Sequence, residues 1–186
     1  MGIETPELTV SQIDFIKRSP MFFVATAPNS SEGHLNCSPR PVDWSFFIDS
    51  AKTVGWFDLV GSGIEMIAHL RENGRIVLMF CSFDSKPLIL RLHGRGVVYQ
   101  PGDDQYESMV ARTQRSLGIR ALVNVEIERV STSCGYGVPV MDFVSHRATM
   151  EDWLQRKGED GLKDYRKKNN LTSIDGLAGL DPERIR

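Results

Sequence analysis

Apolar and polar positions along the chain follow two periods, and the shorter one dominates. Residues 21–27 and 76–80 are continuous apolar runs, whereas residues 119–130 alternate between apolar and polar positions. Runs of this length, bounded by Gly, Pro, Asn or Ser, are typical of β-strands. By the same criteria, further strands are expected over residues 34–38, 44–48, 53–59 and 87–100. The pattern therefore predicts six or seven strands.

Helical spacing is confined to a few segments, and the strands are joined largely by tight turns. Helices are expected over residues 10–18, 64–72, 101–116 and 149–168, the last divided at Gly158. Without a repeated alternation of strand and helix, a doubly wound sheet is excluded and an antiparallel barrel is favoured. We expect one mostly β (α+β) domain over residues 1–140 and a C-terminal helical extension over residues 141–186.

The centre of the pattern is a strand, a Gly61-Ser62-Gly63 turn, a short helix and a second apolar strand, spanning residues 53–83. A strand that ends at a helix N-terminus offers free backbone N–H groups to an anion such as a cofactor phosphate. Alternatively, Ser62 caps the helix and Glu65 completes a capping box. Taken alone, the second interpretation is favoured.

An earlier strand, the one expected over residues 34–38, is followed by two prolines. Pro39 and Pro41 are expected to stop its regular pairing.

Composition narrows the classes of partner. The 186 residues contain 22 Lys and Arg against 24 Asp and Glu, a formal net charge of -2, so nothing drives the chain towards nucleic acid or an anionic membrane. Cys37, Cys81 and Cys134 have no metal-ligand spacing, the four histidines have none either, and no apolar stretch approaches a membrane span. We expect a soluble cytoplasmic protein with reduced thiols and no metal site.

The order of four segments carries a resemblance to a known family. FFVATA, GHLNCSPR, TVGWFDLVGSGIEMIAHLRENGRIVLMF and ILRLHGRG resemble the FMN-binding split barrels of the pyridoxamine 5'-phosphate oxidase-like superfamily over residues 20–131. The resemblance implies a split β-barrel, a homodimer, and FMN in a groove between the subunits. The residues that it places at the cofactor are Ser38, Pro39, Arg40, Trp56, Phe57, Asp58, Gly61, Ser62, Gly63 and Arg91.

Two departures from the family pattern define the function we expect. Basic residues that follow the turn serine in the oxidases of pyridoxamine phosphate are replaced here by Gly63 and Ile64, and their closing Arg-x-His element is absent, since the chain has Ser145-His146-Arg147 instead. Vitamin B6 oxidation is therefore not expected, and phosphate binding falls to Arg40 and the turn's backbone. Two prolines flank Arg40 and limit where its side chain points.

The resulting hypothesis is an FMN-dependent oxidoreductase that acts on an unidentified small molecule. The alternatives are a non-catalytic flavin-binding or sensor protein, and a split barrel that uses deazaflavin or haem. For the flavin enzyme, the cofactor carries the redox chemistry and the protein binds and orients it.

Overall fold

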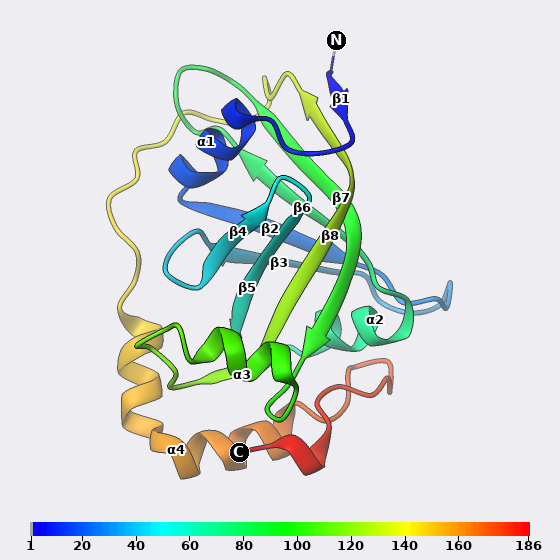
Figure 1. Ribbon diagram of the computed structural model, residues 1–186, viewed down its shortest axis with the longest axis vertical. Coiled ribbons are helices and arrows are strands. Elements are labelled where there is room, and N and C mark those ends of the chain that lie inside the picture. The colour runs from blue at the N-terminus through cyan, green and yellow to red at the C-terminus, as the bar shows by residue number, and fades with distance from the viewer. Residues whose placement is uncertain (1) are drawn as a thin grey trace.

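The computed structural model describes residues 2–186, which form one strongly curved antiparallel sheet with helices at its two ends (Figure 1). Seven strands follow one another in the order β3-β2-β6-β7-β8-β5-β4, and β1 pairs with β8 beside them. The strands are β1 (Glu4–Thr5), β2 (Met21–Thr26), β3 (Asn36–Pro41), β4 (Phe46–Ser50), β5 (Thr53–Leu59), β6 (Arg75–Cys81), β7 (Ile89–Tyr99) and β8 (Ile119–Ser133). The helices are α1 (Val10–Arg18), α2 (Glu65–Asn73), α3 (Asp104–Val110), α4 (Thr149–Asn169) and a 3₁₀ turn, η1 (Pro182–Arg184).

This architecture confirms the expected mostly β split barrel with a C-terminal helix. All its strand pairs are antiparallel. Alternate residues of each strand point into the curve of the sheet, where Phe22, Trp56 and Phe80 are buried against one another. Phe22 lies 5.6 Å from Trp56 and 5.3 Å from Phe80 between ring centroids. Large aromatic side chains therefore fill the barrel interior and fix the strands that carry the site.

The prediction that Pro39 and Pro41 stop strand pairing is wrong. Both residues pair with β2, opposite Phe23 and Met21. The sheet order gives the reason: β3 is an edge strand, so only one side of it needs backbone donors, and proline is tolerated where the missing N–H would face away from the ladder. Arg40 consequently lies within β3, paired with Phe22, rather than after the strand.

The helix predicted over residues 101–116 is also shorter than expected, ending as α3 at Val110. The amides of Arg112 and Thr113 bond to carbonyls three residues back, at Met109 and Val110, which tightens and closes the last turn. Residues 111–118 then form a loop. This loop is free to reach the rim of the barrel.

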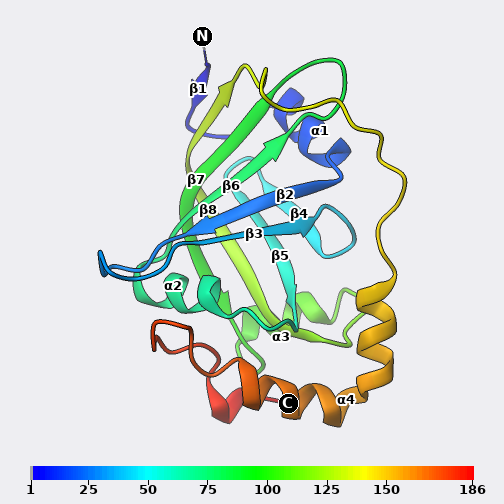
Figure 2. The ribbon, with the colours of Figure 1, turned by 180° about the vertical axis from the view of Figure 1, so that it is seen from behind.

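The C-terminal extension crosses one end of the barrel. The segment between β8 and α4 runs along the outside of the barrel to reach that end (Figure 2). α4 is divided at Gly158, as predicted, because Gly158 has a φ of 63°. Leu154 and Leu162 of α4 are buried against Val60 at the end of β5. Among residues 2–186, no helix is long and apolar enough to cross a membrane.

A bulge in the long strand pair β7–β8 gives the first testable prediction. The register shifts between His93 and Gly94, and a Cβ at Gly94 would overlap the carbonyl oxygen of Glu126. Gly94→Ala should therefore lower the free energy of unfolding by about 1–3 kcal/mol, the usual cost of overpacking. Gly137→Ala, where the added Cβ meets nothing within 4 Å, is the matched control. Equal urea midpoints for both variants would show that the bulge has room for a side chain.

Candidate functional site

One large cavity opens at the barrel rim, with a volume of about 1410 Å³. Its walls come from β3, the end of β5, the turn that follows β5, the loop before β8, and the start of the C-terminal extension. The predicted site residues that line it are Ser38, Pro39, Arg40, Trp56, Phe57, Asp58, Gly61, Ser62 and Gly63. Segments far apart in sequence are thus brought to one place.

Arg91 is the predicted residue that the structure does not bring to this cavity. It lies on β7 opposite Met79 and Ser131, and its Nη1 donates to Ser133 Oγ at 2.9 Å. Arg91 is not among the residues that line the cavity.

The centre of the site is a carboxylate held between two arginines. Asp58 is 1 % exposed; its Oδ1 lies 3.0 Å from Nη2 of Arg40, and its Oδ2 accepts a 2.8 Å hydrogen bond from Nε of Arg120. Burial alone would raise the pKa of Asp58, but the positive charges of Arg120 and Arg40 outweigh burial and hold that pKa below its ordinary value. Asp58 is therefore ionised in the fold, and the three groups together carry one net positive charge.

Arg120 was not predicted from the sequence. It stands at the start of β8, inside a register shift that pairs Asp58 with Ala121 and Leu59 with Ile119, so Arg120 is the extra, unpaired residue of a bulge. A bulge turns a side chain out of the strand's alternation, and Arg120 is accordingly only 3 % exposed. The signal in the sequence that could have indicated such a residue was Asp58, because a carboxylate inside an apolar strand requires a buried cation.

Arg120 also determines the shape of the glycine turn. Its Nη1 donates to the carbonyl oxygen of Gly61 at 3.1 Å, and its Nη2 donates to that of Gly63 at 2.8 Å. One guanidinium thus holds Asp58 and two turn carbonyls through its fork of fixed donors, an arrangement that lysine cannot reproduce. The turn is fixed from the inside of the protein.

The capping box predicted for Ser62 and Glu65 is not formed. Helix α2 begins at Glu65, its N-cap is Ile64, and no side chain caps it from the Ser62 position. Because Arg120 holds the Gly63 carbonyl, the chain enters the helix later than the pattern indicated. Glu65 instead accepts a 3.0 Å hydrogen bond from the Ile64 amide through Oε2, so a carboxylate of this chain already occupies the helix N-terminus.

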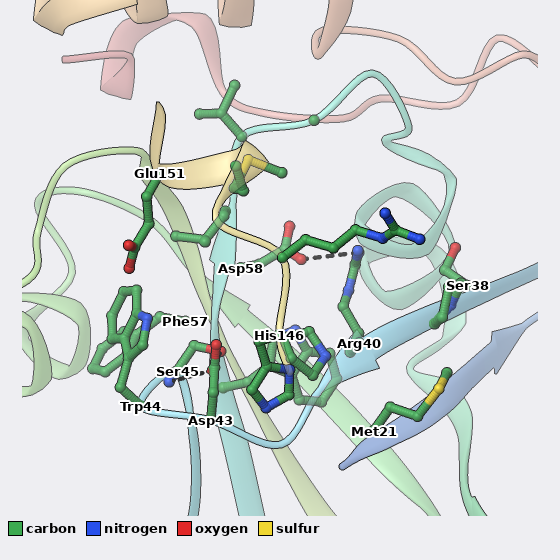
Figure 3. Close-up of a pocket in the computed structure, with 18 of the residues that line it drawn as sticks. Met21, Ser38, Arg40, Asp43, Trp44, Ser45, Phe57, Asp58, His146 and Glu151 are labelled. Carbon is green, nitrogen blue, oxygen red and sulfur yellow. Dashed lines mark hydrogen bonds and ion pairs between the residues drawn. The ribbon is translucent and has the colours of Figure 1, made fainter. Parts of the chain in front are cut away.

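Donors without partners remain near Arg40. Within residues 2–186, Arg40 Nε and Asn36 Nδ2 are buried and make no hydrogen bond. Ser38 lies beside them and donates to Asn36 Oδ1 at 3.0 Å, and Figure 3 shows Arg40 reaching towards Asp58 with Ser38 on its other side. Buried polar groups are ordinarily paired. This wall of the cavity therefore has the donors that an anionic ligand needs.

The opposite wall is aromatic. Trp44 stacks on Phe57 with ring centroids 6.2 Å apart and an interplanar angle of 25°. The guanidinium of Arg115 lies 5.7 Å from the centroid of the Trp44 ring and also contacts Glu151 of α4 at 2.7 Å. The sequence pattern gave no indication of Trp44 or of the extension as parts of the site. Together they form a surface suited to a flat ring.

An exposed apolar segment leads away from this wall. Val140, Met141, Phe143 and Val144 are 73 %, 59 %, 58 % and 91 % exposed, and Met141 and Phe143 also line the cavity. Four large apolar side chains in five residues form a surface of the kind that partners cover. We call residues 140–144 the apolar segment.

Comparison with known proteins identifies the family to which the chain is similar. The family model described as "Pyridoxamine 5'-phosphate oxidase" matches residues 11–134. The chain is 38% identical, over 185 residues, to the pyridoxamine 5'-phosphate oxidase family protein ustO of Aspergillus flavus; the match covers 90% of this chain and 73% of that protein.

Solved structures share the fold at lower identity. HupZ of Group A Streptococcus, in its H111A form, superposes with a TM-score of 0.55 and 21% identity, covering 67% of this chain and 98% of that one. A Clostridium acetobutylicum protein related to general stress protein 26 of Bacillus subtilis, described as of the pyridoxinephosphate oxidase family, gives a TM-score of 0.50 and 18% identity over 67% of this chain and 87% of its own. These two similarities concern the fold alone.

The buried carboxylate gives the second prediction. Asp58→Asn should lower the free energy of unfolding by about 3 kcal/mol at neutral pH, because it leaves two arginines without their counter-charge. Since the pKa of Asp58 is lower in the fold than in the unfolded chain, this stabilisation is fully present above about pH 4, the pKa of an unfolded aspartate. It is lost as the pH falls through the lower, folded pKa.

The measurement is urea unfolding of wild type and variant between pH 7 and pH 3, with the exposed Asp49→Asn as control. The difference between Asp58→Asn and wild type should be constant at neutral pH and shrink in acid. A difference that grows as the pH falls would contradict the charge assignment.

Proposed function

Because the chain belongs to the pyridoxamine 5'-phosphate oxidase-like superfamily, we propose that it is an FMN-binding split-barrel oxidoreductase whose cofactor occupies the cavity at the barrel rim. The substrate is a small molecule other than a vitamin B6 phosphate, since the Arg-x-His element that grips such a phosphate is absent from the sequence.

The observation that carries the proposal is the surplus positive charge of Arg40. Arg120 already neutralises Asp58 at 2.8 Å, so the charge of Arg40 is left for a ligand, while the ion pair with Asp58 keeps its guanidinium in place. Its Nε is buried without a partner in residues 2–186. A guanidinium binds phosphate oxygens through parallel hydrogen bonds, so a phosphate is the ligand group that this arrangement fits.

The walls of the cavity fit both parts of FMN, the flat ring system and the phosphate. A cofactor with a flat ring system and a phosphate needs an aromatic or apolar surface at one end and donors at the other. Trp44 and Phe57 supply the first, and Arg40 and Asn36 supply the second, with the Ser38 hydroxyl holding the Asn36 side chain in place. A Cβ added at Gly61 meets no atom within 4 Å, so this chain's own packing does not require a glycine there and space is left over the turn.

When bound, FMN would supply transfer of hydride or of single electrons, and the protein supplies the environment. In this proposal Arg40 binds the phosphate, Trp44 and Phe57 orient the ring, and the start of α4 excludes water from the cavity. A flavin alone in solution reacts unselectively with oxygen and reductants, so such enclosure is what turns a bound flavin into an enzyme for one substrate.

We further propose that two copies of the chain form a homodimer around the cofactor. The apolar segment, residues 140–144, is exposed in one chain and adjoins the cavity. A second copy would cover these side chains and complete the cavity wall that they border, in the way that a symmetric interface uses the same surface twice.

The enzymatic part of the proposal is tested by stopped-flow absorbance of the FMN-loaded protein without oxygen. NADPH or NADH should bleach the flavin band, and a series of candidate acceptors should restore it at different rates. A flavin that neither nucleotide reduces faster than it reduces free FMN would favour the non-catalytic, flavin-binding alternative.

Arg40→Ala gives the third prediction. A charge-assisted hydrogen bond contributes about 1.5–3 kcal/mol, so the variant should bind FMN about tenfold to hundredfold more weakly. Riboflavin, which has no phosphate, should lose little affinity. Folding should be kept, because Asp58 retains Arg120 at 2.8 Å.

Both affinities are measured by quenching of flavin fluorescence, and Arg95→Ala is the control because Arg95 pairs with Glu128 rather than lining the cavity. An equal loss for FMN and riboflavin would mean that Arg40 contacts the ring or supports the fold.

The fourth prediction concerns the apolar segment. Val144 is 91 % exposed, so Val144→Asp should leave the isolated chain folded but place a charge in the proposed interface, which no partner group balances. Sedimentation should change from about twice the chain mass of 20.9 kDa towards one chain mass, with weaker FMN binding.

Val10→Asp is the control, since Val10 is 77 % exposed on α1, away from the cavity. A wild-type protein that sediments as a single chain at micromolar concentration would remove the shared cofactor site.

A further inference from the structure

The C-terminal extension reaches the glycine turn directly. Asn170, the C-cap residue that follows α4, is fully buried and donates from Nδ2 to the carbonyl oxygen of Gly61 at 2.8 Å. The same oxygen accepts the 3.1 Å hydrogen bond from Arg120 Nη1. A carbonyl oxygen has two lone pairs, and both acceptor sites of Gly61 are thus used by buried side chains.

The residues after Asn170 pack against the start of α2. The amide of Ile174 donates to Glu65 Oε1 at 3.4 Å, and the amide of Leu180 donates to the carbonyl oxygen of Asn170 at 2.8 Å. At Gly179, an added Cβ would lie within 2.5 Å of the Ile64 side chain. The extension therefore holds both sides of the turn, Gly61 before it and Ile64 after it.

These contacts fix the direction of one backbone donor. Residues 2–186 contain no cis peptide bond, and in a trans peptide the carbonyl and the N–H point in opposite directions. The Gly61 carbonyl faces Arg120 and Asn170, so the Ser62 amide of the same peptide faces away from them. Ser62 lines the cavity, and no hydrogen bond from its amide is found within residues 2–186.

We propose that Asn170 is a positioning residue of the cofactor site: together with Arg120 it holds the Gly61–Ser62 peptide so that the Ser62 amide donates to the phosphate of FMN. The proposal rests on the proposed function for the identity of the ligand. It extends that function to a segment beyond the family match, which ends at residue 134. The helix N-terminus itself is not the phosphate site, because Glu65 occupies it.

The test uses the full chain with Asn170→Leu and with Asn170→Asp, which has the same size and, when ionised, lacks the donor. Asn169→Leu is the matched control, because Asn169 is the preceding residue and its Nδ2 donates only to the Tyr165 carbonyl of its own helix. FMN and riboflavin affinities are measured for each protein, and ¹⁵N relaxation gives the order parameter of the Ser62 amide in the flavin-free protein.

Loss of one hydrogen bond that orients a donor should weaken FMN binding about threefold to tenfold in both Asn170 variants. Riboflavin affinity should change less than twofold, and the Ser62 order parameter should fall from the rigid range, about 0.85, towards that of a flexible loop. The Asn169 variant should match wild type in all three measurements.

Unchanged FMN affinity in both Asn170 variants would overturn the proposal, and so would equal losses for FMN and riboflavin, which would make Asn170 a support of the fold alone. If the wild type binds no FMN, the proposed function fails by itself. The order parameter then decides the positioning role: a fall in the Asn170 variants upholds it, and no change overturns it.

Discussion

The site depends on one buried carboxylate. Asp58 lies near the end of β5 and is 1 % exposed, and an isolated charge in that position would cost more free energy than the net stability of a typical fold. It is tolerated because Arg40 comes from the edge strand β3 and Arg120 from the bulge at the start of β8. The requirement to neutralise Asp58 thus joins three strands at the rim of the cavity.

The shape of the cavity follows from the same requirement. Once Arg120 is turned inwards to Asp58, its remaining donors are within reach of the carbonyls of Gly61 and Gly63, which hold the turn and delay the start of α2. Once Asp58 is neutralised by Arg120, the charge of Arg40 is available to a ligand. A structural ion pair and a proposed phosphate site are therefore two consequences of one arrangement, and the C-terminal extension adds Asn170 to it.

Much of this fold was predictable because strands and short helices are determined by local pattern. The break of α4 at Gly158, for example, follows from one residue whose backbone takes a conformation that glycine favours. The bounds of β3 did not, because whether proline stops a strand depends on whether that strand lies at a sheet edge. Sheet order is a property of the whole chain.

The candidate site also contains residues that could be predicted from the sequence and residues that could not. The family resemblance had named many of the residues that line the cavity, from Ser38 on β3 to Gly63 in the turn. Arg120 was missed because a charged residue in an alternating strand is ordinarily placed on the outside, and only the register shift turns it inwards. Asn170 was missed because it lies 109 residues from Gly61, and no local pattern relates the two.

The most direct measurement of this account is a crystal structure of the protein with FMN. The account predicts a phosphate oxygen about 2.7–3.2 Å from the Arg40 guanidinium and from the Ser62 amide, with Asp58 and Arg120 still paired. A phosphate bound elsewhere, for instance at Arg91 on β7, or an FMN outside the cavity at the barrel rim, would contradict it.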